Sequence, residues 1–217
     1  MATLVLVRHA TTAATGKRLG GWTPGVHLDA RGRDQAEAVG RRLAELPVAA
    51  VYASPLERTQ ETARILARPH ALRVRTRRGI GEVDFGEWTD RPLGHLRRRK
   101  AWQLVQQTPS RVTFPGGESI RSAQARVVDT LEELAAAHGD DVIVVVSHAD
   151  VIKAALAHFL AMPLDAFQRL VVAPAAVSVL HLDDGAVPVV SRVNDTGAAP
   201  IVPRSNRPRG VEGRRPR

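Results

Sequence analysis

Two histidines in this sequence directly follow short apolar strands. Residues 3–7 lead into Arg8-His9, and residues 142–146 lead into Ser147-His148. In open α/β sheets, ligands bind at the carboxyl ends of the strands. Arginine is a permanent planar cation that suits a phosphate, and histidine is able to act as a nucleophile at neutral pH. The pattern predicts phosphate chemistry, although either strand end taken alone also fits a strand that stops at polar residues.

A third strand-to-helix junction carries a second arginine. The predicted strand Val48–Ala53 is followed by Ser54, a predicted N-cap, and by Pro55, a residue favoured at the first helical position. Arg58 then falls in the first turn of this helix. If the three strands are neighbours in one sheet, two imidazoles and two guanidiniums meet beside the positive end of a helix dipole. Such a set of groups fits a tetrahedral dianion.

The remaining chain alternates between strand and helix patterns, which predicts a sheet of βαβ type. After the first strand, the expected elements include a helix from the N-cap Asp29 to Pro47, a strand over 72–76, a long helix capped by Ser119, a helix capped by Asp150, and a hairpin at Asp184-Gly185.

Residues 77–117 interrupt this alternation. Several glycines and the Pro-Gly-Gly motif at 115–117 break any long element, while Trp88 and Trp102 indicate ordered packing. We therefore expect a cap-like insertion that contains one short helix over residues 93–105.

The 217 residues predict a single domain over residues 1–195, followed by a disordered basic tail over 196–217. The net charge is +9, but residues 204–217 hold six arginines and one glutamate, which carry +5 of it. The folded body is then only mildly basic. Aromatic residues are 4% of the chain and do not alternate with the basic ones, so we expect no nucleic-acid partner.

Cysteine is absent, which excludes disulfides, thiolate zinc sites and cysteine nucleophiles. This composition fits a cytoplasmic protein. The apolar residues 142–162 are interrupted by His148, Asp150 and Lys153, so we expect no membrane span. No pattern of His, Asp and Glu predicts a metal site.

A run of four basic residues, Arg97 to Lys100, lies inside the insertion. It is placed either to hold an anionic substrate near the entrance of the site or to form an ordinary solvated helix face.

Six motifs follow one another along residues 3–193: LVRHATT, LDARGRDQA, YASPLERTQETA, GEVDFGEWTD, PGGES and VVSHADVIKA. Together they resemble the histidine phosphatase superfamily, in its phosphoglycerate-mutase-like branch. The resemblance covers nearly everything except the tail. It implies an α/β fold with three α/β/α layers and a mostly parallel central sheet.

The resemblance also implies a role for each matching residue. His9 would be the nucleophile that forms a phosphohistidine, while Arg8 and Arg58 would hold the phosphate oxygens. His148 would donate to the same phosphate. Glu82 would protonate the leaving alcohol and then activate water. A carboxylic acid beside a dianion has a raised pKa, which suits this use.

The identity of the acid stays open between nearby carboxylates, because Asp84 and Glu87 belong to the same segment as Glu82.

The sequence also departs from the family pattern. Ala10 and Ala149 stand where glycine is usual, and Thr15 stands where an asparagine contacts the phosphate. Thr15 would keep one hydrogen bond to the substrate. Gly21 lies where the mutases bind substrate through a Thr-Gly pair, and is our second candidate substrate contact outside the core group.

We interpret the chain as a phosphatase that hydrolyses small phosphorylated metabolites without a metal or other cofactor. The segment DFGEWTD lacks the RHYG typical of mutases, which favours hydrolysis. The alternatives are a bisphosphate-dependent phosphoglycerate mutase and a non-catalytic module that binds a phosphorylated ligand. A C-terminal edge strand that pairs between subunits would give a homodimer. The physiological substrate does not follow from the sequence.

Overall fold

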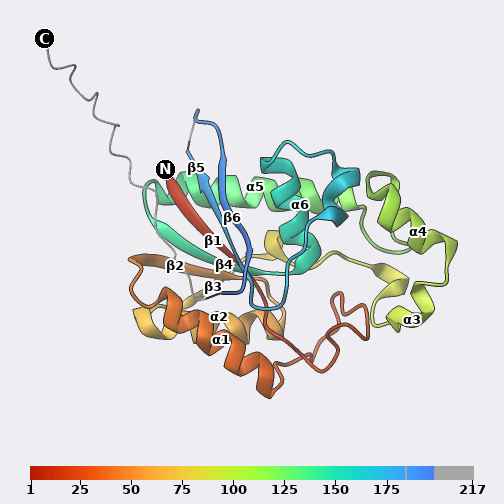
Figure 1. Ribbon diagram of the computed structural model, residues 1–217, viewed down its shortest axis with the longest axis horizontal. Coiled ribbons are helices and arrows are strands. Elements are labelled where there is room, and N and C mark those ends of the chain that lie inside the picture. Colours follow the sequence, from red (N-terminus) through yellow and green to blue (C-terminus); the bar gives the residue numbers. More distant parts are fainter. Residues whose placement is uncertain (184, 198–217) are drawn as a thin grey trace, which may run out of the picture.

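A six-stranded sheet with the order β3-β2-β4-β1-β5-β6 forms the centre of the computed structural model (Figure 1). The structure describes residues 1–183 and 185–197. Neighbouring strands from β3 through β1 run parallel, whereas β5 and β6 are antiparallel. The mostly parallel sheet expected from the alternating pattern is confirmed. The strands are β1 (Ala2–Arg8), β2 (Val48–Ala53), β3 (Val74–Thr76), β4 (Val142–Ser147), β5 (Val177–Leu182) and β6 (Val189–Asp195).

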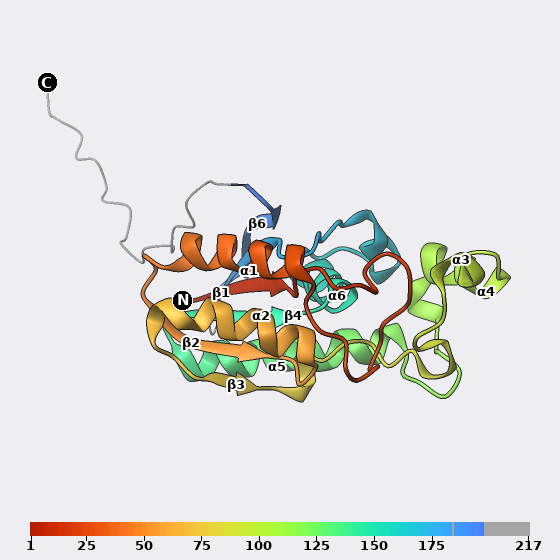
Figure 2. The same cartoon turned by 90° about the horizontal axis from the view of Figure 1, so that it is seen from below.

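Helices cover both faces of this sheet, as Figures 1 and 2 show. Helices α1 (Ala30–Leu43) and α2 (Glu57–Ala67) lie on one face, and α5 (Ile120–His138) and α6 (Ala149–Phe159) lie on the other. The two short helices α3 (Leu93–Leu96) and α4 (Lys100–Gln107) lie beyond one end of the sheet. The three-layer α/β/α sandwich is therefore confirmed. Short 3-10 helices occupy Arg68–His70, Arg78–Ile80, Gly86–Trp88, Pro109–Arg111 and Leu164–Arg169.

The central strands are buried on both faces, which explains their unbroken apolar sequence. Successive side chains of a strand point to opposite faces. Leu4 and Leu6 of β1 therefore join the core under α5 and α6, while Val5 and Val7 join the core under α1 and α2.

The register of the sheet brings three strand ends to one level. Arg8 lies opposite Ser147, and Ala53 lies opposite Val146. The ladder continues one step past the strands, because the His9 N–H donates to the Ser147 carbonyl at 2.9 Å. The polar residues that follow β1, β4 and β2 consequently gather at one edge.

Two of the predicted helix caps are confirmed. The Asp29 side chain accepts from the Gly32 N–H at 2.7 Å, and the Ser119 side chain accepts from the Ser122 N–H at 3.0 Å.

The other two predicted caps are wrong. Helix α2 begins at Glu57, because Leu56 keeps an extended backbone and occupies the N-cap position in place of Ser54. Helix α6 begins at Ala149, so Asp150 lies inside its first turn, where its carboxylate pairs with Lys153 Nζ at 2.7 Å.

Residues 77–117 form an excursion from the sheet with a narrow base. At this base the Glu118 N–H donates to the Asp84 carbonyl, and the Glu87 N–H donates to the Pro115 carbonyl, both at 2.9 Å. Gly86 has φ +50°, and a Cβ there would lie 2.1 Å from the Pro115 oxygen. Only glycine therefore lets the two passing segments approach so closely.

The single helix expected over 93–105 is two helices, α3 and α4. Arg99 has an extended backbone and ends the first before the second begins. Trp88 stacks on Trp102 with ring centroids 6.3 Å apart and meets Phe114 edge to face. Trp88 and Phe114 belong to the same core as Leu4 and Leu6 of β1, and Trp102 packs against it.

Two sequence predictions concern the C-terminal tail and the hairpin before it. The predicted tail lies outside the described residues except for Thr196 and Gly197, and so does Asp184 of the expected hairpin turn. Within the described ranges, no helix is long and apolar enough to cross a membrane.

The first turn of α1 packs directly on the loop after β1. A Cβ at Gly32 would lie 2.1 Å from the Thr11 carbonyl oxygen, whereas one at Gly40 would lie 3.6 Å from its nearest neighbour, the Ile65 oxygen. We expect Gly32→Ala to lower the free energy of unfolding by about 2 kcal/mol through overpacking. Gly40→Ala in the same helix should be neutral or stabilise by up to about 1 kcal/mol through helix propensity. Urea unfolding of both variants measures this, and equal effects would contradict the packing argument.

Candidate active site

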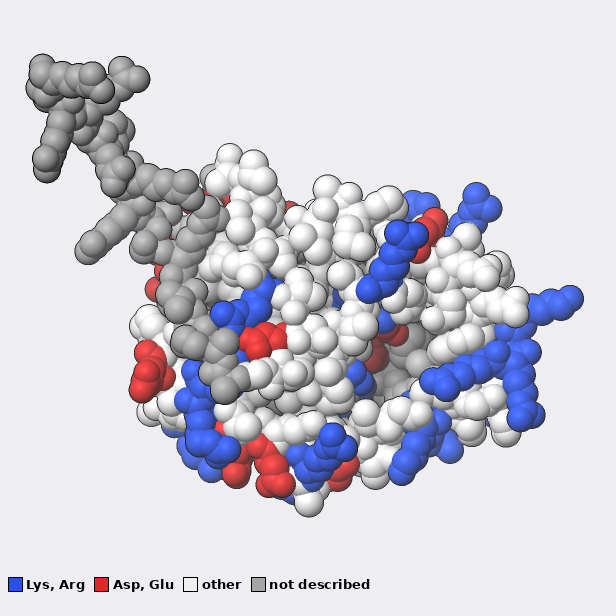
Figure 3. Space-filling model, viewed as in Figure 1, with Lys and Arg blue, Asp and Glu red and all other residues white. Residues whose placement is uncertain are grey.

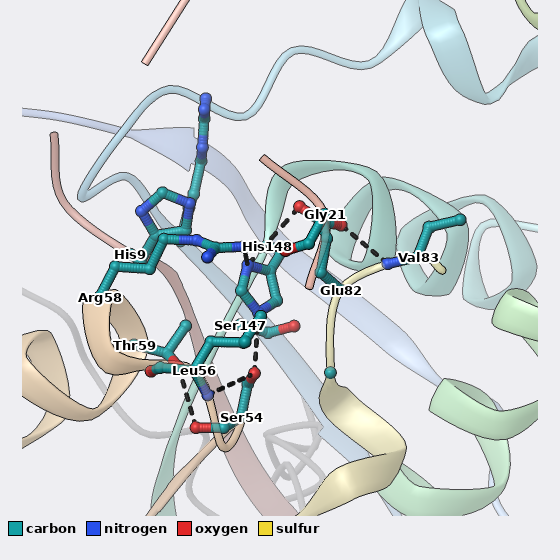
Figure 4. Close-up of polar contacts among 12 residues, drawn as sticks. His9, Gly21, Ser54, Leu56, Arg58, Thr59, Glu82, Val83, Ser147 and His148 are labelled. Carbon is teal, nitrogen blue, oxygen red and sulfur yellow. Dashed lines mark hydrogen bonds and ion pairs between the residues drawn. The ribbon is translucent and has the colours of Figure 1, made fainter. Parts of the chain in front are cut away.

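The structure brings the predicted imidazole and guanidinium groups together where β1, β4 and β2 end (Figure 4). The ring centroids of His9 and His148 lie 5.3 Å apart. Arg58 Nη2 lies 3.4 Å from His148 Nδ1. All three residues are buried. Arg8 and His9 line the same cavity as Arg58.

The proton position on His9 follows from its hydrogen bond. Nδ1 lies 2.8 Å from the Ala10 carbonyl oxygen, which can only accept, so Nδ1 carries the proton. The lone pair is then on Nε2. Burial, followed by the charges of Arg58 and Arg8, holds the pKa of His9 well below its usual value. His9 is therefore a neutral imidazole with a free lone pair, the form that acts as a nucleophile.

The two guanidiniums are only partly satisfied. Arg8 Nη1 donates to the Val172 carbonyl at 2.7 Å, and Arg58 Nη2 donates to the Gly21 carbonyl at 2.8 Å. Arg8 Nε and Arg58 Nη1 are buried without a hydrogen-bond partner. Among the described residues, neither guanidinium forms an ion pair at 4.0 Å or less with a carboxylate. Buried unpaired donors of this kind are costly unless an anion completes the site.

Glu82 faces this group from the first part of the excursion, ahead of its narrow base at Asp84. Its Oε2 lies 3.6 Å from His148 Nδ1, and its Oε1 accepts from the Val83 N–H at 3.0 Å. Burial, reinforced by the nearby Asp150 carboxylate and opposed by Arg58, raises the pKa of Glu82 to about 7. A carboxyl group with this pKa both donates and accepts a proton near neutral pH.

Of the three carboxylates that the sequence offered as the acid, only Glu82 lies at the cavity. Glu82 lines the cavity, whereas Asp84 and Glu87 do not. The Asp84 carboxylate instead accepts from the Gly86 N–H at 3.0 Å and belongs to the turn at the base of the excursion.

The cavity has a volume of about 310 Å³ and continues from the guanidiniums toward α3 and α4. Charged residues in its lining include Arg18, Arg97, Asp150 and Lys153. Figure 3 shows basic side chains gathered on the α3–α4 side of the hollow. In the described part of the chain, no cluster of three or more His, Asp or Glu residues is arranged to hold a metal ion.

A model of the histidine phosphatase superfamily (branch 1) matches residues 4–196. The chain belongs to this superfamily. Phosphoserine phosphatase 1 of Hydrogenobacter thermophilus is 31% identical over 188 residues, covering 85% of this chain and 88% of that protein. Phosphoglycerate mutase-like protein 4 of Arabidopsis thaliana is 32% identical over 157 residues, covering 70% of this chain and 68% of that protein.

A solved structure shares the fold of this histidine phosphatase. YhfR of Bacillus stearothermophilus aligns with a TM-score of 0.85 at 25% identity, covering 91% of this chain and 99% of that chain. The family resemblance and the fold expected from the motifs are both confirmed.

The substitutions of glycine by alanine in this histidine phosphatase are accommodated by the backbone. Ala10 and Ala149 are not among the described residues with positive φ, so neither position requires glycine. Ala10 is fully buried, and its N–H donates to Thr62 Oγ1 at 3.1 Å.

Thr15 and Gly21 have different surroundings. Thr15 lines the cavity, but its hydroxyl already accepts from the Thr12 N–H at 2.9 Å. Gly21 does not line the cavity, although its neighbour Gly20 does. The Gly21 carbonyl holds Arg58 in place, so the contact seen in the structure is with the guanidinium.

Arg126 of α5 organises the loop that carries Glu82, a role that sequence reasoning missed. Its guanidinium donates to the carbonyls of Gly79, Gly81 and Glu82, at 2.8, 2.8 and 2.9 Å, and pairs with the Glu118 carboxylate at 2.6 Å. Nothing in the local sequence separates this arginine from others on a helix surface.

Lys153 was also missed. It is buried beside the cavity, where Nζ bonds Asp150 at 2.7 Å and Gln168 at 2.7 Å. The spacing of Asp150 and Lys153, three residues apart on one helix, was a signal that could have indicated their pairing.

The pKa of Glu82 generates a test of its role as the acid. A raised pKa of about 7 means that the carboxyl is protonated below pH 7 and loses its proton as the pH rises through that value. We expect Glu82→Gln to slow hydrolysis of alkyl phosphates by about 100-fold, the usual size of general acid catalysis. Aryl phosphates with good leaving groups should be affected far less. Measurements of kcat/KM against pH and leaving group test this.

The exposed Glu87 provides the matched control for that experiment. Glu87→Gln should keep the wild-type profile with both classes of substrate. Wild-type turnover of alkyl phosphates by Glu82→Gln would assign the acid to another residue.

Proposed function

We propose that this histidine phosphatase hydrolyses small phosphomonoesters through a phosphohistidine on His9, without a metal ion. One observation carries the proposal: the buried N–H groups of Arg8 and Arg58 that lack a partner lie in the same site as a neutral His9 with its Nε2 lone pair free. A phosphoryl group would satisfy those donors and place phosphorus before the nucleophile.

In the first step, His9 Nε2 forms a bond to phosphorus as the bond to the leaving oxygen breaks. Arg8, Arg58 and His148 stabilise the charge on the phosphoryl oxygens. Glu82 donates its proton to the leaving oxygen, so the alcohol departs neutral and the carboxylate remains.

In the second step, water replaces the histidine. The Glu82 carboxylate takes a proton from the water molecule, whose oxygen forms the new bond to phosphorus as the bond to Nε2 breaks. Inorganic phosphate is released, and Glu82 is protonated again for the next cycle.

The charged lining of the cavity favours substrates that carry a second charged group besides the phosphate. Arg97 lines it with a side chain that has no partner among the described residues, while Lys153 and Asp150 are already paired with each other. A free cation at this place would attract a carboxylate on the substrate. Because one relative is named phosphoserine phosphatase 1, O-phosphoserine is the first substrate to test.

The proposal also includes the domain bounds, the cellular location and the partners of the protein. We place the catalytic domain at residues 1–195, with 77–117 as the cap that selects the substrate and 196–217 as an appended basic tail. A chain without cysteine fits the cytoplasm. Association into a homodimer through the C-terminal edge strand, and the absence of a nucleic-acid partner, belong to the same proposal.

Removal of the nucleophile tests the mechanism. His9→Ala should abolish hydrolysis of p-nitrophenyl phosphate, because it removes the nitrogen that forms the bond to phosphorus. A chelator should leave wild-type turnover unchanged. Rapid acid quenching should trap an acid-labile phosphoenzyme in the wild type only. Turnover that persists in His9→Ala would refute the phosphohistidine mechanism.

The same assays separate the alternatives. Interconversion of phosphoglycerates, primed by the bisphosphate, at a rate well above hydrolysis would identify a mutase. Phosphate binding by a wild-type protein that turns over no phosphomonoester would identify a non-catalytic module.

A charge on the cavity rim provides a test of substrate selection. Arg97→Gln should raise KM for O-phospho-L-serine by about tenfold, which corresponds to roughly 1.4 kcal/mol. Its KM for p-nitrophenyl phosphate should change little, because that substrate carries no carboxylate. Arg98→Gln is the matched control, since Arg98 is exposed next to Arg97 but does not line the cavity. Equal effects of the two variants would mean that Arg97 acts only through general charge.

A further inference from the structure

His148 is enclosed by three polar groups that together define where its proton lies. Its Nδ1 lies 3.4 Å from Arg58 Nη2 and 3.6 Å from Glu82 Oε2. Its Nε2 lies 2.8 Å from the hydroxyl oxygen of Ser54. Figure 4 shows the ring between the guanidinium on one side and the serine on the other. His148 and Ser54 are both fully buried.

A guanidinium has no lone pair, so Arg58 can only donate in this contact. His148 Nδ1 is therefore the acceptor. Burial, followed by the charge of Arg58, lowers the pKa of His148 well below its usual value and keeps the ring neutral. A neutral imidazole has one N–H, which must then be on Nε2, and the Ser54 hydroxyl oxygen accepts it.

The two catalytic-site imidazoles therefore hold their protons on different nitrogens. His9 carries its proton on Nδ1, toward the Ala10 carbonyl. His148 carries its proton on Nε2, toward Ser54. In each ring, a protein acceptor fixes the proton and leaves a lone pair on the other nitrogen.

We propose that Ser54 is a positioning residue that anchors the Nε2 proton of His148, so that Nδ1 takes up the acidic proton of a phosphate monoanion as it binds. The proposal rests on the proposed function. The O–H bond of the phosphate breaks as an N–H bond forms at Nδ1. The substrate becomes a dianion, and His148 becomes an imidazolium that donates to the phosphate from Nδ1 and to Ser54 from Nε2.

This proton transfer changes which acceptor Arg58 contacts. In the free protein, Nη2 of Arg58 donates to Nδ1 of His148. Once Nδ1 is protonated, that N–H of Arg58 is released toward the phosphate. The charged and titratable groups around His148 are Arg58 from α2, Arg8 and His9 from the end of β1, Glu82 from its loop and Arg126 from α5.

Ser54 is held firmly enough to act in this way. Its N–H donates to the Val146 carbonyl at 3.1 Å, and its carbonyl accepts from Thr59 Oγ1 at 2.9 Å and from Gln60 Nε2 at 2.7 Å. The hydroxyl oxygen also accepts from the Leu56 N–H at 3.5 Å, so it is held by the backbone at the start of α2. Removal of this hydroxyl in Ser54→Ala would leave the Nε2 proton buried without an acceptor.

Nitrogen-15 NMR of the eight histidine rings tests the proposal without requiring catalysis, with the His148 signals assigned from a His148→Gln variant. In the free wild-type protein at neutral pH, we expect a neutral His148 protonated on Nε2. Saturating inorganic phosphate should convert it to an imidazolium. A ring protonated on Nδ1 in the free protein, or no change with phosphate, would overturn the proposal.

Variants of two buried serines complete the experiment. Ser54→Ala should lose the Nε2–H pattern and lower kcat by roughly 10- to 100-fold with a smaller change in KM, as for other residues that orient a histidine. Ser54→Thr keeps the hydroxyl and should show the wild-type Nε2–H pattern and the wild-type kcat. Ser147→Ala removes a comparable buried hydroxyl, which donates to the Ile80 carbonyl at 2.7 Å, and should keep the wild-type ring pattern.

The outcomes are distinguishable. A wild-type ring pattern in Ser54→Ala, or the same altered pattern in Ser147→Ala, would reject the specific role of Ser54. An inactive wild-type protein that still shows the expected free and phosphate-bound patterns would instead reject the proposed function and leave the role of Ser54 intact.

Discussion

Parallel pairing of β4 with β1 on one side and β2 on the other determines where every group of the site lies. The three strands end at the same level because Arg8 lies opposite Ser147 and Ala53 lies opposite Val146. A shift of one residue in either register would turn the apolar side chains of that strand to the wrong face. The hydrophobic core therefore fixes the register, and the register in turn places the imidazoles and guanidiniums together.

At this edge of the sheet, burial and nearby charges together set the pKa values of the site residues. Burial, followed by the charge of Arg58, lowers the pKa of both His9 and His148, which keeps both rings neutral. Arg58 and Arg8 favour an ionised Glu82, but burial and Asp150 outweigh them. A rise in the pKa from 4.5 to about 7 corresponds to roughly 3 kcal/mol against the charged carboxylate. The site thus holds a neutral imidazole, the proposed nucleophile, beside a carboxyl group with a raised pKa, the proposed acid.

Much of this arrangement could be predicted from the sequence, because it depends on local patterns. The apolar strands ending at His9 and His148, and the caps Asp29 and Ser119, are readable from a few neighbouring residues. Arg126 could not be predicted, because its contacts with the Glu82 loop arise only when α5 crosses that loop.

Ser54 shows a different limit. A serine before a proline is typical of a helix N-cap, but the extended backbone of Leu56 delays the helix start. The Ser54 hydroxyl oxygen then accepts from the Leu56 N–H outside the helix and also contacts His148. Local preference and tertiary structure compete for the same side chain, and tertiary structure decides. The break between α3 and α4 has a similar origin, since the extended backbone of Arg99 interrupts an otherwise continuous helical pattern.

The narrow base of the excursion has an evolutionary consequence. The chain leaves and re-enters the domain through adjacent segments, joined by the backbone bonds of Asp84 with Glu118 and of Glu87 with Pro115. The segment between these points packs around Trp88, Trp102 and Phe114, which join the core shared with the sheet. Positions of this segment outside the shared core can change while the sheet and the proposed phosphate-binding groups stay constant. One catalytic scaffold could thereby acquire new substrate preferences by exchange of this segment, and grafting at the base is a practical route for redesign.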